Sequence, residues 1–219
     1  MTDVLTMPES LYVFGSARFN LVTLNTSTQQ SPFAPMMRVS GPSIGYWQAD
    51  LTFRPREGRA DIDELMRFIL KLKGGRVLAR IFDPYRVARS GDTQPSGAGG
   101  VGPVVNVGTD AAAGAETIHL VGLVAAQAAA LRAMDQIGIG ENLHAVLDPG
   151  PSDADGEGTF SIWPPLRQGV AEGDPVSLVK PTGRFRLVKG GEDLTQFGRA
   201  HTYAEALTLS FVEEPDFDA

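Results

Sequence analysis

Short apolar runs, each bounded by turn residues, divide the sequence between Val104 and Val179. Strands of this kind at regular spacing are typical of a small β-barrel or β-sandwich. The runs are PVVNVG, ETIHLVG, DQIGIG, LHAVLD, TFSIWP and DPVSLV. We expect PSDADGEG, between Leu147 and Phe160, to form the loop of a hairpin. We expect the alanine-rich segment AAQAAALRAM to hold one helical turn.

The residues before this region predict three further strands. Residues 11–24 and 46–55 are rich in β-branched and aromatic residues with apolar alternation, and the second run ends at Pro55. RVLARIF is a third run, and it is closed by Asp83-Pro84. Residues 90–103 contain many glycines and two prolines, a composition that indicates a linker or an exposed loop.

One amphipathic helix is predicted from Asp61. Its apolar residues recur at helical spacing, and they form a stripe of Ile62, Leu65, Met66, Ile69 and Leu72. Asp61 and Glu64 have the spacing of a capping box at the start, and Gly74-Gly75 can supply a left-handed end. Phe68 and Leu70 lie off the stripe, so we expect a second face of the helix to be covered as well.

The last alternating run, YAEALTLSFVEE at residues 203–214, has no strand beside it in the sequence. An unpaired strand at a chain end is normally tied into a sheet, so we expect it to return to the N-terminal strands. The sequence therefore predicts a mainly β (α+β) fold with a discontinuous β-sandwich or belt domain, residues 1–95 and 184–219. Residues 96–183 would be an inserted β-rich module.

Composition and charge exclude several classes of protein. The 219 residues carry a net charge of −7 and no cysteine, so disulfides, thiolate metal sites and cysteine nucleophiles are excluded. No signal peptide is recognisable at the start, and the run from Leu120 to Leu131 is too short to span a bilayer. We therefore expect no membrane insertion and a soluble compartment. Sequence-specific nucleic-acid binding is not expected, because the nearest basic group surrounds one helix end: Lys71, Lys73, Arg76 and Arg80.

Three catalytic or ligand-binding patterns occur in unsuitable contexts. GPSIG would make Ser43 a nucleophile, but a strand follows it directly where a nucleophile elbow needs a helix. GAGGVG, from Gly97 to Gly102, lies in the glycine-rich loop rather than between a strand and a helix. DADGEG, from Asp153 to Gly158, lacks the remaining ligands of a calcium loop.

The histidines and paired carboxylates do not predict a site either. His119, His144 and His201 have no metal-ligand spacing, and the first two alternate within strands. We attribute the carboxylate pairs to helix capping and to a solvated acidic tail; they are Asp61/Asp63, Glu213/Glu214 and Asp216/Asp218. We therefore expect no catalytic, cofactor-binding or metal-binding residue, and no cofactor.

The segment FSIWPPLRQGVAEGDPVSLV raises the question of a binding site or a seam between modules. Pro164 and Pro165 cannot donate ladder hydrogen bonds, so a strand should end there, with Leu166 returning to the core. Trp163 is expected to be buried with its N–H satisfied or, alternatively, to be a contact residue. We interpret the segment as a module seam.

Three parts of the sequence resemble the distal tail proteins of long-tailed, siphovirus-type phages and phage-like elements. They are YWQADLTFRP with DIDELMRFILKLKGGRVLARIFDPYR, then DQIGIGENLHAVL with DADGEGTFSIWPPLRQGVAEGDPVSLVKPTGRFRLV, and finally the last alternating strand. The resemblance implies a non-enzymatic virion protein, assembled in the host cytoplasm, that forms a six-fold ring between tail tube and tip. Its partners would be further copies of itself, the tail tube, and the tip or hub proteins.

Other functions stay open at this point. A carbohydrate-binding module would stack sugar on Trp163, Tyr85 or Trp47, and a small hydrolase would use Ser43. A different tail subunit, of the tube or the tip attachment, would have the same features. The loop that holds Phe33, Met36 and Met37 is either an arm between subunits or a cover over its own core.

Overall fold

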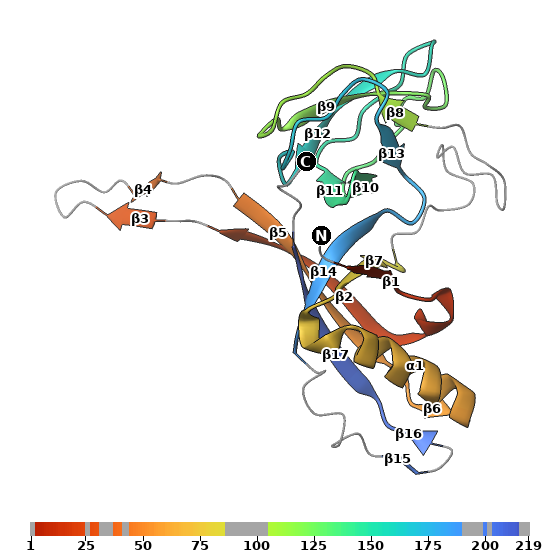
Figure 1. Cartoon of the computed structure of the whole chain (residues 1–219). Coiled ribbons are helices and arrows are strands. Elements are labelled where there is room, and N and C mark those ends of the chain that lie inside the picture. Colours follow the sequence, from red (N-terminus) through yellow and green to blue (C-terminus); the bar gives the residue numbers. More distant parts are fainter. Residues whose placement is uncertain are drawn as a thin grey trace.

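An open six-stranded sheet and a closed six-stranded barrel are the two main parts of the chain (Figure 1). The computed structural model describes residues 3–24, 27–30, 37–40, 44–85, 105–189, 199–200 and 203–214. Strands on both sides of the barrel in sequence belong to the sheet, so the barrel is an insertion. The predicted mainly β fold with an inserted barrel is confirmed. Of the predicted boundaries, 95/96 lies outside the described residues and 183/184 lies just inside a sheet strand.

The sheet combines both ends of the chain. Its order is β1 (Val4–Thr6), β7 (Leu78–Phe82), β14 (Thr182–Lys189), β17 (Leu207–Glu213), β5 (Ile44–Phe53) and β2 (Phe14–Leu24). Neighbouring strands are antiparallel except β1 and β7, which are parallel. The predicted return of the last strand is confirmed, because β17 lies between β14 and β5.

One face of the sheet forms the core with helix α1 (Arg59–Lys71). Alternate residues of the central strands point to this face and are buried, among them Trp47, Leu51, Phe53, Phe185, Leu209 and Phe211. On the other face Thr52 and Thr208 share a hydrogen bond of 3.0 Å. The described strands here form one sheet covered by a helix, which differs from the sandwich that the sequence suggested.

The start of α1 differs from the sequence prediction, whereas its C-terminal end agrees with it. The helix begins at Arg59, and no side chain caps its start, so the expected Asp61–Glu64 capping box is wrong. Glu64 instead accepts a hydrogen bond of 2.7 Å from Ser10. At the other end Gly74 has φ 65° and Gly75 has φ 88°, which confirms the left-handed end; a short 3-10 turn, η2 (Lys73–Gly75), follows the helix.

The buried stripe of α1 is also slightly displaced. Ile62, Leu65, Ile69 and Leu72 are buried as predicted, but Phe68 joins them in the core and Met66 is only half-buried. Leu70 is 62% exposed, so the expectation that a second face of the helix is covered is wrong for this residue.

The barrel closes in the order β10 (Gln136–Ile139), β11 (Asn142–Val146), β12 (Gly158–Trp163), β9 (Thr117–Val121), β8 (Val105–Val107) and β13 (Pro175–Ser177). All six runs that the sequence predicted as strands are strands, and every pair is antiparallel. The barrel has a core of its own, which includes Val107, Leu120, Ile137, Phe160 and Ile162. PSDADGEG connects β11 to β12, as predicted for a hairpin loop.

The segment AAQAAALRAM is not helical, so that prediction is wrong. Ala126 and Met134 have positive φ angles, and the segment is a series of turns interrupted by an isolated bridge between Leu131 and Gly150. Its backbone is held by the neighbouring loop, since the N–H of Ala130 donates to the Gly150 carbonyl at 2.9 Å. Tertiary hydrogen bonds here override the helix propensity of alanine.

Smaller elements complete the described structure. β3 (Ser27–Gln30) and β4 (Met37–Ser40) pair beyond the ends of β2 and β5, away from the body of the molecule (Figure 1). β6 (Arg56–Glu57), β16 (Tyr203–Ala204) and β15 (Arg199–Ala200) form a small third sheet, and η1 (Glu9–Leu11) is a single 3-10 turn.

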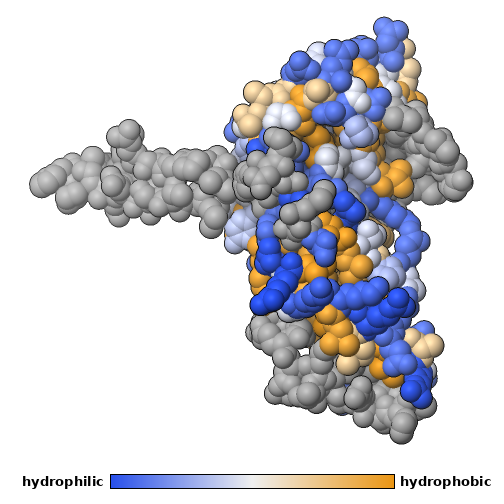
Figure 2. Space-filling view, viewed as in Figure 1, coloured by the Kyte–Doolittle hydropathy of each residue, from blue (hydrophilic) through white to orange (hydrophobic). Residues whose placement is uncertain are grey.

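Hydrophobic side chains at the surface are scattered. Figure 2 shows them in several separate areas over both the barrel and the sheet. The most exposed large ones are Val13, Leu70 and Tyr85. Isolated apolar residues of this kind are normal on a protein surface, and none of them defines a site alone.

Candidate functional site at the junction of sheet and barrel

Barrel strand β11 packs against the core of the sheet. Leu143 and Ala145 are fully buried in the same cluster as Trp47, Phe185 and Phe211, whereas Val146 faces the barrel core. In Figure 1, β10 and β11 lie on the side of the barrel that is nearest the sheet. One strand therefore contributes to two separate hydrophobic cores, and β11 links the barrel to the sheet.

Trp47 on β5 joins the two parts directly. The residue is 2% exposed, and Nε1 donates a hydrogen bond of 2.9 Å to the Leu143 carbonyl. A buried tryptophan with a satisfied N–H is a core residue rather than a platform for a ligand. The structure thus removes Trp47 from the aromatic residues that could stack on a sugar.

The carboxylate of Glu213, at the end of β17, is the polar centre of the junction. Its side chain is 1% exposed, and it accepts hydrogen bonds from the backbone N–H of Trp47 at 3.0 Å and of Leu143 at 3.2 Å. The guanidinium of Arg167, 7% exposed, lies 3.3 Å from the same carboxylate and also donates to the Gly45 carbonyl. We call Trp47, Leu143, Arg167 and Glu213 the junction cluster.

Burial shifts the pKa values of both charged residues in the junction cluster. Burial raises the pKa of the Glu213 carboxyl above its usual value, and this effect is opposed by the Trp47 N–H, the Arg167 charge and the Leu143 N–H. Burial also lowers the pKa of Arg167, against the pull of Glu213. Each charge depends on the other, because removal of either one leaves its partner buried and unpaired.

His144 on β11 lies beside this cluster. Its imidazole is buried, and Nδ1 is 2.7 Å from the Pro164 carbonyl oxygen. Burial lowers the pKa of His144 to about 4, and the nearby Arg167 charge acts in the same direction. The ring is therefore neutral at physiological pH, and its Nδ1–H donates to the carbonyl.

Trp163, the last residue of β12, lies over β5. A Cβ atom placed on Gly45 would be 2.9 Å from Trp163 Nε1, so the indole fits only because residue 45 has no side chain. The strand ends at Trp163 before the two prolines, and Leu166 is buried in the barrel core, as the sequence predicted. Trp163 and Arg167 of this segment lie against the sheet at Gly45 and Glu213, whereas Phe160, Leu166, Val170 and Val176 are buried in the barrel core.

Two ion pairs stand at the rim of the junction. Arg80 on β7 makes two hydrogen bonds to Glu141 of the β10–β11 turn, at 2.8 and 2.6 Å. Lys180 pairs with Glu9 at 2.6 Å and lies 5.5 Å from the centre of the Phe82 ring. These pairs are partly exposed and add less than the buried cluster.

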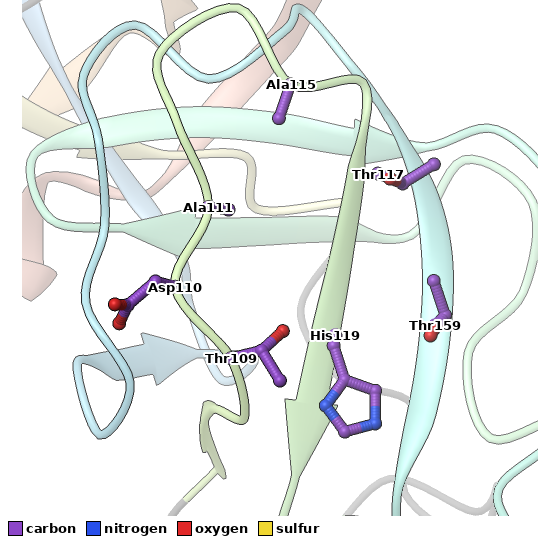
Figure 3. Close-up of a pocket in the computed structure, with 7 residues that line it drawn as sticks. All are labelled: Thr109, Asp110, Ala111, Ala115, Thr117, His119 and Thr159. Carbon is purple, nitrogen blue, oxygen red and sulfur yellow. The ribbon is translucent and has the colours of Figure 1, made fainter.

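A shallow hollow of about 480 Å³ lies on the outer surface of the barrel (Figure 3). It is lined by Thr109, Asp110, Ala111, Ala115, Thr117, His119 and Thr159. Thr117 and His119 come from β9, and Thr159 comes from β12. His119 Nε2 lies 3.6 Å from a Glu157 oxygen at the margin of this surface. The lining contains no Phe, Tyr or Trp ring on which a sugar could stack.

The remaining residues singled out in the sequence are dispersed. Tyr85 is 65% exposed, and Trp163 is half-buried. Ser43, Gly97–Gly102, Phe33, Met36, His201, Asp216 and Asp218 lie outside the described residues, as does the Met37 side chain. Asp153 accepts from the N–H groups of Asp155 and Glu157, mainly the latter, which lowers the pKa of its carboxyl. This carboxylate organises its own turn.

Glu213 corrects one prediction. The sequence suggested that Glu213 and Glu214 belong to a solvated acidic tail, whereas Glu213 is a buried strand residue and Glu214 pairs with Arg186 on β14. A signal was available, because Glu213 continues the alternation of Leu207, Leu209 and Phe211 toward the core. A carboxylate at such a position requires hydrogen-bond donors from another part of the chain.

Within the described ranges, no group of three or more histidine, aspartate or glutamate side chains is placed to hold a metal ion. Nor does any helix there have the length and apolar composition needed to cross a membrane. The hydrogen bonds of the junction cluster join β5, β11, β17 and the segment that follows β12.

No family model matches the sequence, and no curated protein matches it.

Proposed function

We propose that this chain is a non-enzymatic structural component of a phage tail. In this role it forms a ring at the distal end of the tail tube and connects the tube to the tip or baseplate. The proposal rests first on the sequence resemblance to distal tail proteins. The observation that supports it best is the path of the chain, in which both ends build one sheet and a barrel is inserted between them.

The junction cluster is consistent with a connecting role. A subunit that links two parts of a particle must transmit force between its own domains without changing their relative orientation. Here β11 links the barrel to the sheet, and a buried ion pair with two backbone donors fixes the seam. A mobile linker between independent modules would show neither feature.

The partners that follow from this proposal are further copies of the chain, the tail tube, and the tip or hub proteins. Six copies per ring is the number that the resemblance implies. The protein would be assembled in the host cytoplasm and would reside in the tail of the virion. The net charge of −7 is in keeping with solubility before assembly.

Carbohydrate binding is the competing function, and the structure gives it less support. One of its three aromatic candidates, Trp47, is buried in the core. Isothermal titration with simple hexoses tests it: heat of binding that is lost in a Tyr85→Ala or Trp163→Ala variant would favour this function.

The experiment that tests the ring is the mass of the purified chain by light scattering, followed by negative-stain imaging. We expect closed rings with a central hole that matches the width of a tail tube. A protein that remains monomeric at all concentrations, alone and with isolated tail tubes, would contradict the proposal.

A further inference from the structure

β2 forms one margin of the sheet. It is eleven residues long, and within the described part of the chain its only partner strand is β5. The outer side of such a strand presents a row of backbone N–H and C=O groups that can pair with another strand. The backbone groups along this edge of the sheet can therefore pair with a further β-strand.

The usual protections of a free edge are almost absent from β2. The strand contains no proline and one charged residue, Arg18. Its bulge lies at the start, between Phe14 and Ser16, where Arg54 Nε also donates to the Phe14 carbonyl at 2.9 Å. From Ala17 to Leu24 the pairing with β5 is regular, and no described strand pairs with the outer edge.

The apolar side chains of β2 are also only partly buried at this edge of the sheet. Ala17, Phe19 and Leu21 point to the core face and pack against it, but they are only half-buried. Phe19 meets the ring of Phe185 edge-on, with 6.0 Å between ring centres. On the opposite face Ser16, Arg18 and Asn20 are exposed. A further strand with the same alternation would complete the burial.

The opposite margin of the sheet has matching features. β1 pairs with β7, and its outer edge has no partner among the described residues. Leu5 points to the core face and is half-buried, while Thr6 points to the other face and is exposed. Both margins therefore combine a free backbone edge with an incompletely covered apolar side chain.

The two edge strands run in the same direction. Four antiparallel steps lead from β2 through β5, β17 and β14 to β7, and the last step, to β1, is parallel. A rotation about an axis along the strands places β2 of one copy beside β1 of the next. The two strands then meet in parallel.

We propose that copies of this chain join head to tail through β2 and the β1 strand of a neighbouring copy, which continues the sheet from subunit to subunit. This inference rests on the proposed ring and names its contact. A two-fold pairing of β2 with itself would bury one margin and leave both β1 edges uncovered. The head-to-tail contact uses both margins of every subunit, and heterologous contacts of this kind close rings.

The register within the sheet gives a first estimate of which residues meet. Strand pairing places Leu5 level with Leu21, through Ala79, Phe185, Glu213 and Trp47. The step from Glu213 to Trp47 continues the register of Val212 with Gln48. On the outer face, Thr6 is then level with Val22. Strand tilt in a closed ring moves neighbouring subunits along the strand direction, so positions Arg18, Asn20 and Val22 should be compared.

The natural chain has no cysteine, so disulfide trapping needs no background mutation. Thr6→Cys is combined in turn with Arg18→Cys, Asn20→Cys or Val22→Cys, and the purified protein is oxidised and run on a denaturing gel. We expect one pairing to give a ladder of oligomers that ends at the ring, while each single variant stays monomeric on the gel.

Dimers from a single β2 cysteine variant would overturn the head-to-tail contact in favour of the two-fold one. The absence of intermolecular disulfides from all three double variants would also overturn it. If light scattering of the same samples still shows rings, only this inference fails. If light scattering shows no species beyond a dimer, both alone and with isolated tail tubes, the proposed ring fails as well.

A charge placed on the core face of β2 provides a second test. Leu21→Lys should weaken self-association about tenfold or more, because a lysine at a half-buried edge position opposes strand addition. Asn20→Lys adds the same charge on the exposed face and should change association far less. Unfolding midpoints confirm that both variants fold. Equal association constants for the two variants would refute a contact through this face.

Discussion

Replacement of Arg167 by methionine tests the junction cluster most sharply. Methionine keeps an apolar stem of similar length but removes the guanidinium that lies 3.3 Å from the Glu213 carboxylate. Glu213, 1% exposed, then keeps the backbone N–H groups of Trp47 and Leu143 as its donors. The Gly45 carbonyl loses its Arg167 donor at the same time.

The expected loss of stability is large for the removal of one side-chain contact. Loss of one partner from a buried ion pair destabilises a protein by about 3–5 kcal/mol. We expect about 3 kcal/mol here, because two N–H donors remain on Glu213. Burial already raises the pKa of this carboxyl, and loss of the positive charge raises it further. The neutral acid therefore forms more readily as the pH falls, so the destabilisation should be smaller at pH 5 than at pH 8.

The assay is urea unfolding of wild type and variant at both pH values, monitored by tryptophan fluorescence and by circular dichroism. Arg80→Met is the matched control, because its partner Glu141 is one-third exposed and solvent screens the pair. The control should cost less than about 1 kcal/mol. A cost for Arg167→Met that is no larger than the control, or that grows as the pH falls, would refute the account of the junction.

Three further predictions concern single residues, each measured by urea unfolding. Burial holds the pKa of His144 at about 4 against an ordinary 6.5, so the stability that its neutral form contributes is complete above pH 6.5 and is lost as the pH falls toward 4. That loss should be about 3 kcal/mol, and His144→Gln should not show it. Gly45→Ala should cost about 1–3 kcal/mol, since its Cβ would lie 2.9 Å from Trp163 Nε1, and Trp163→Leu should restore part of the loss. Gly75→Ala, at φ 88° and with a carbonyl oxygen 2.4 Å from the new Cβ, should cost more than Gly74→Ala, where nothing lies within 4 Å. The His144 argument would be disproved if His144→Gln and wild type lost the same stability between pH 6.5 and 4. The glycine arguments would be disproved if Gly45→Ala were as stable as wild type, or Gly75→Ala as stable as Gly74→Ala.

Local patterns predicted the strands because each short run keeps its own apolar alternation. The runs around Ile118, Ile137 and Phe160 were found in this way, and so was the return of β17 to the N-terminal strands. Alternation shows which side of a strand is buried, but it does not name the partner strand. Closure of the barrel between β13 and β8 therefore became visible only in the structure.

The errors arose where long-range contacts outweigh local preference. Asp61 and Glu64 have capping spacing, yet the helix begins two residues earlier and Glu64 is engaged by Ser10. The alanine-rich segment favours a helix by propensity, but Ala126 has φ 54° and its N–H donates to the Asp153 carbonyl. In both places the deciding partner is far away in sequence.

The junction cluster shows the same limit. Arg167 was part of a conspicuous segment, and Glu213 lay on the buried side of an alternating strand, but no sequence pattern joins positions 46 residues apart. Their encounter depends on how the inserted barrel is seated on the sheet. The sequence therefore indicated a seam, and the fold was needed to identify its polar centre.

The most direct test of the proposed function is the position of this chain in a particle. Phage or phage-like particles whose genome encodes the chain would be labelled with a gold-conjugated antibody against it and imaged. The account predicts label at one end of the tail, where the tube meets the tip. Label along the whole tube would assign the chain to the tube, and purified tailed particles without any label would contradict a structural role in the tail.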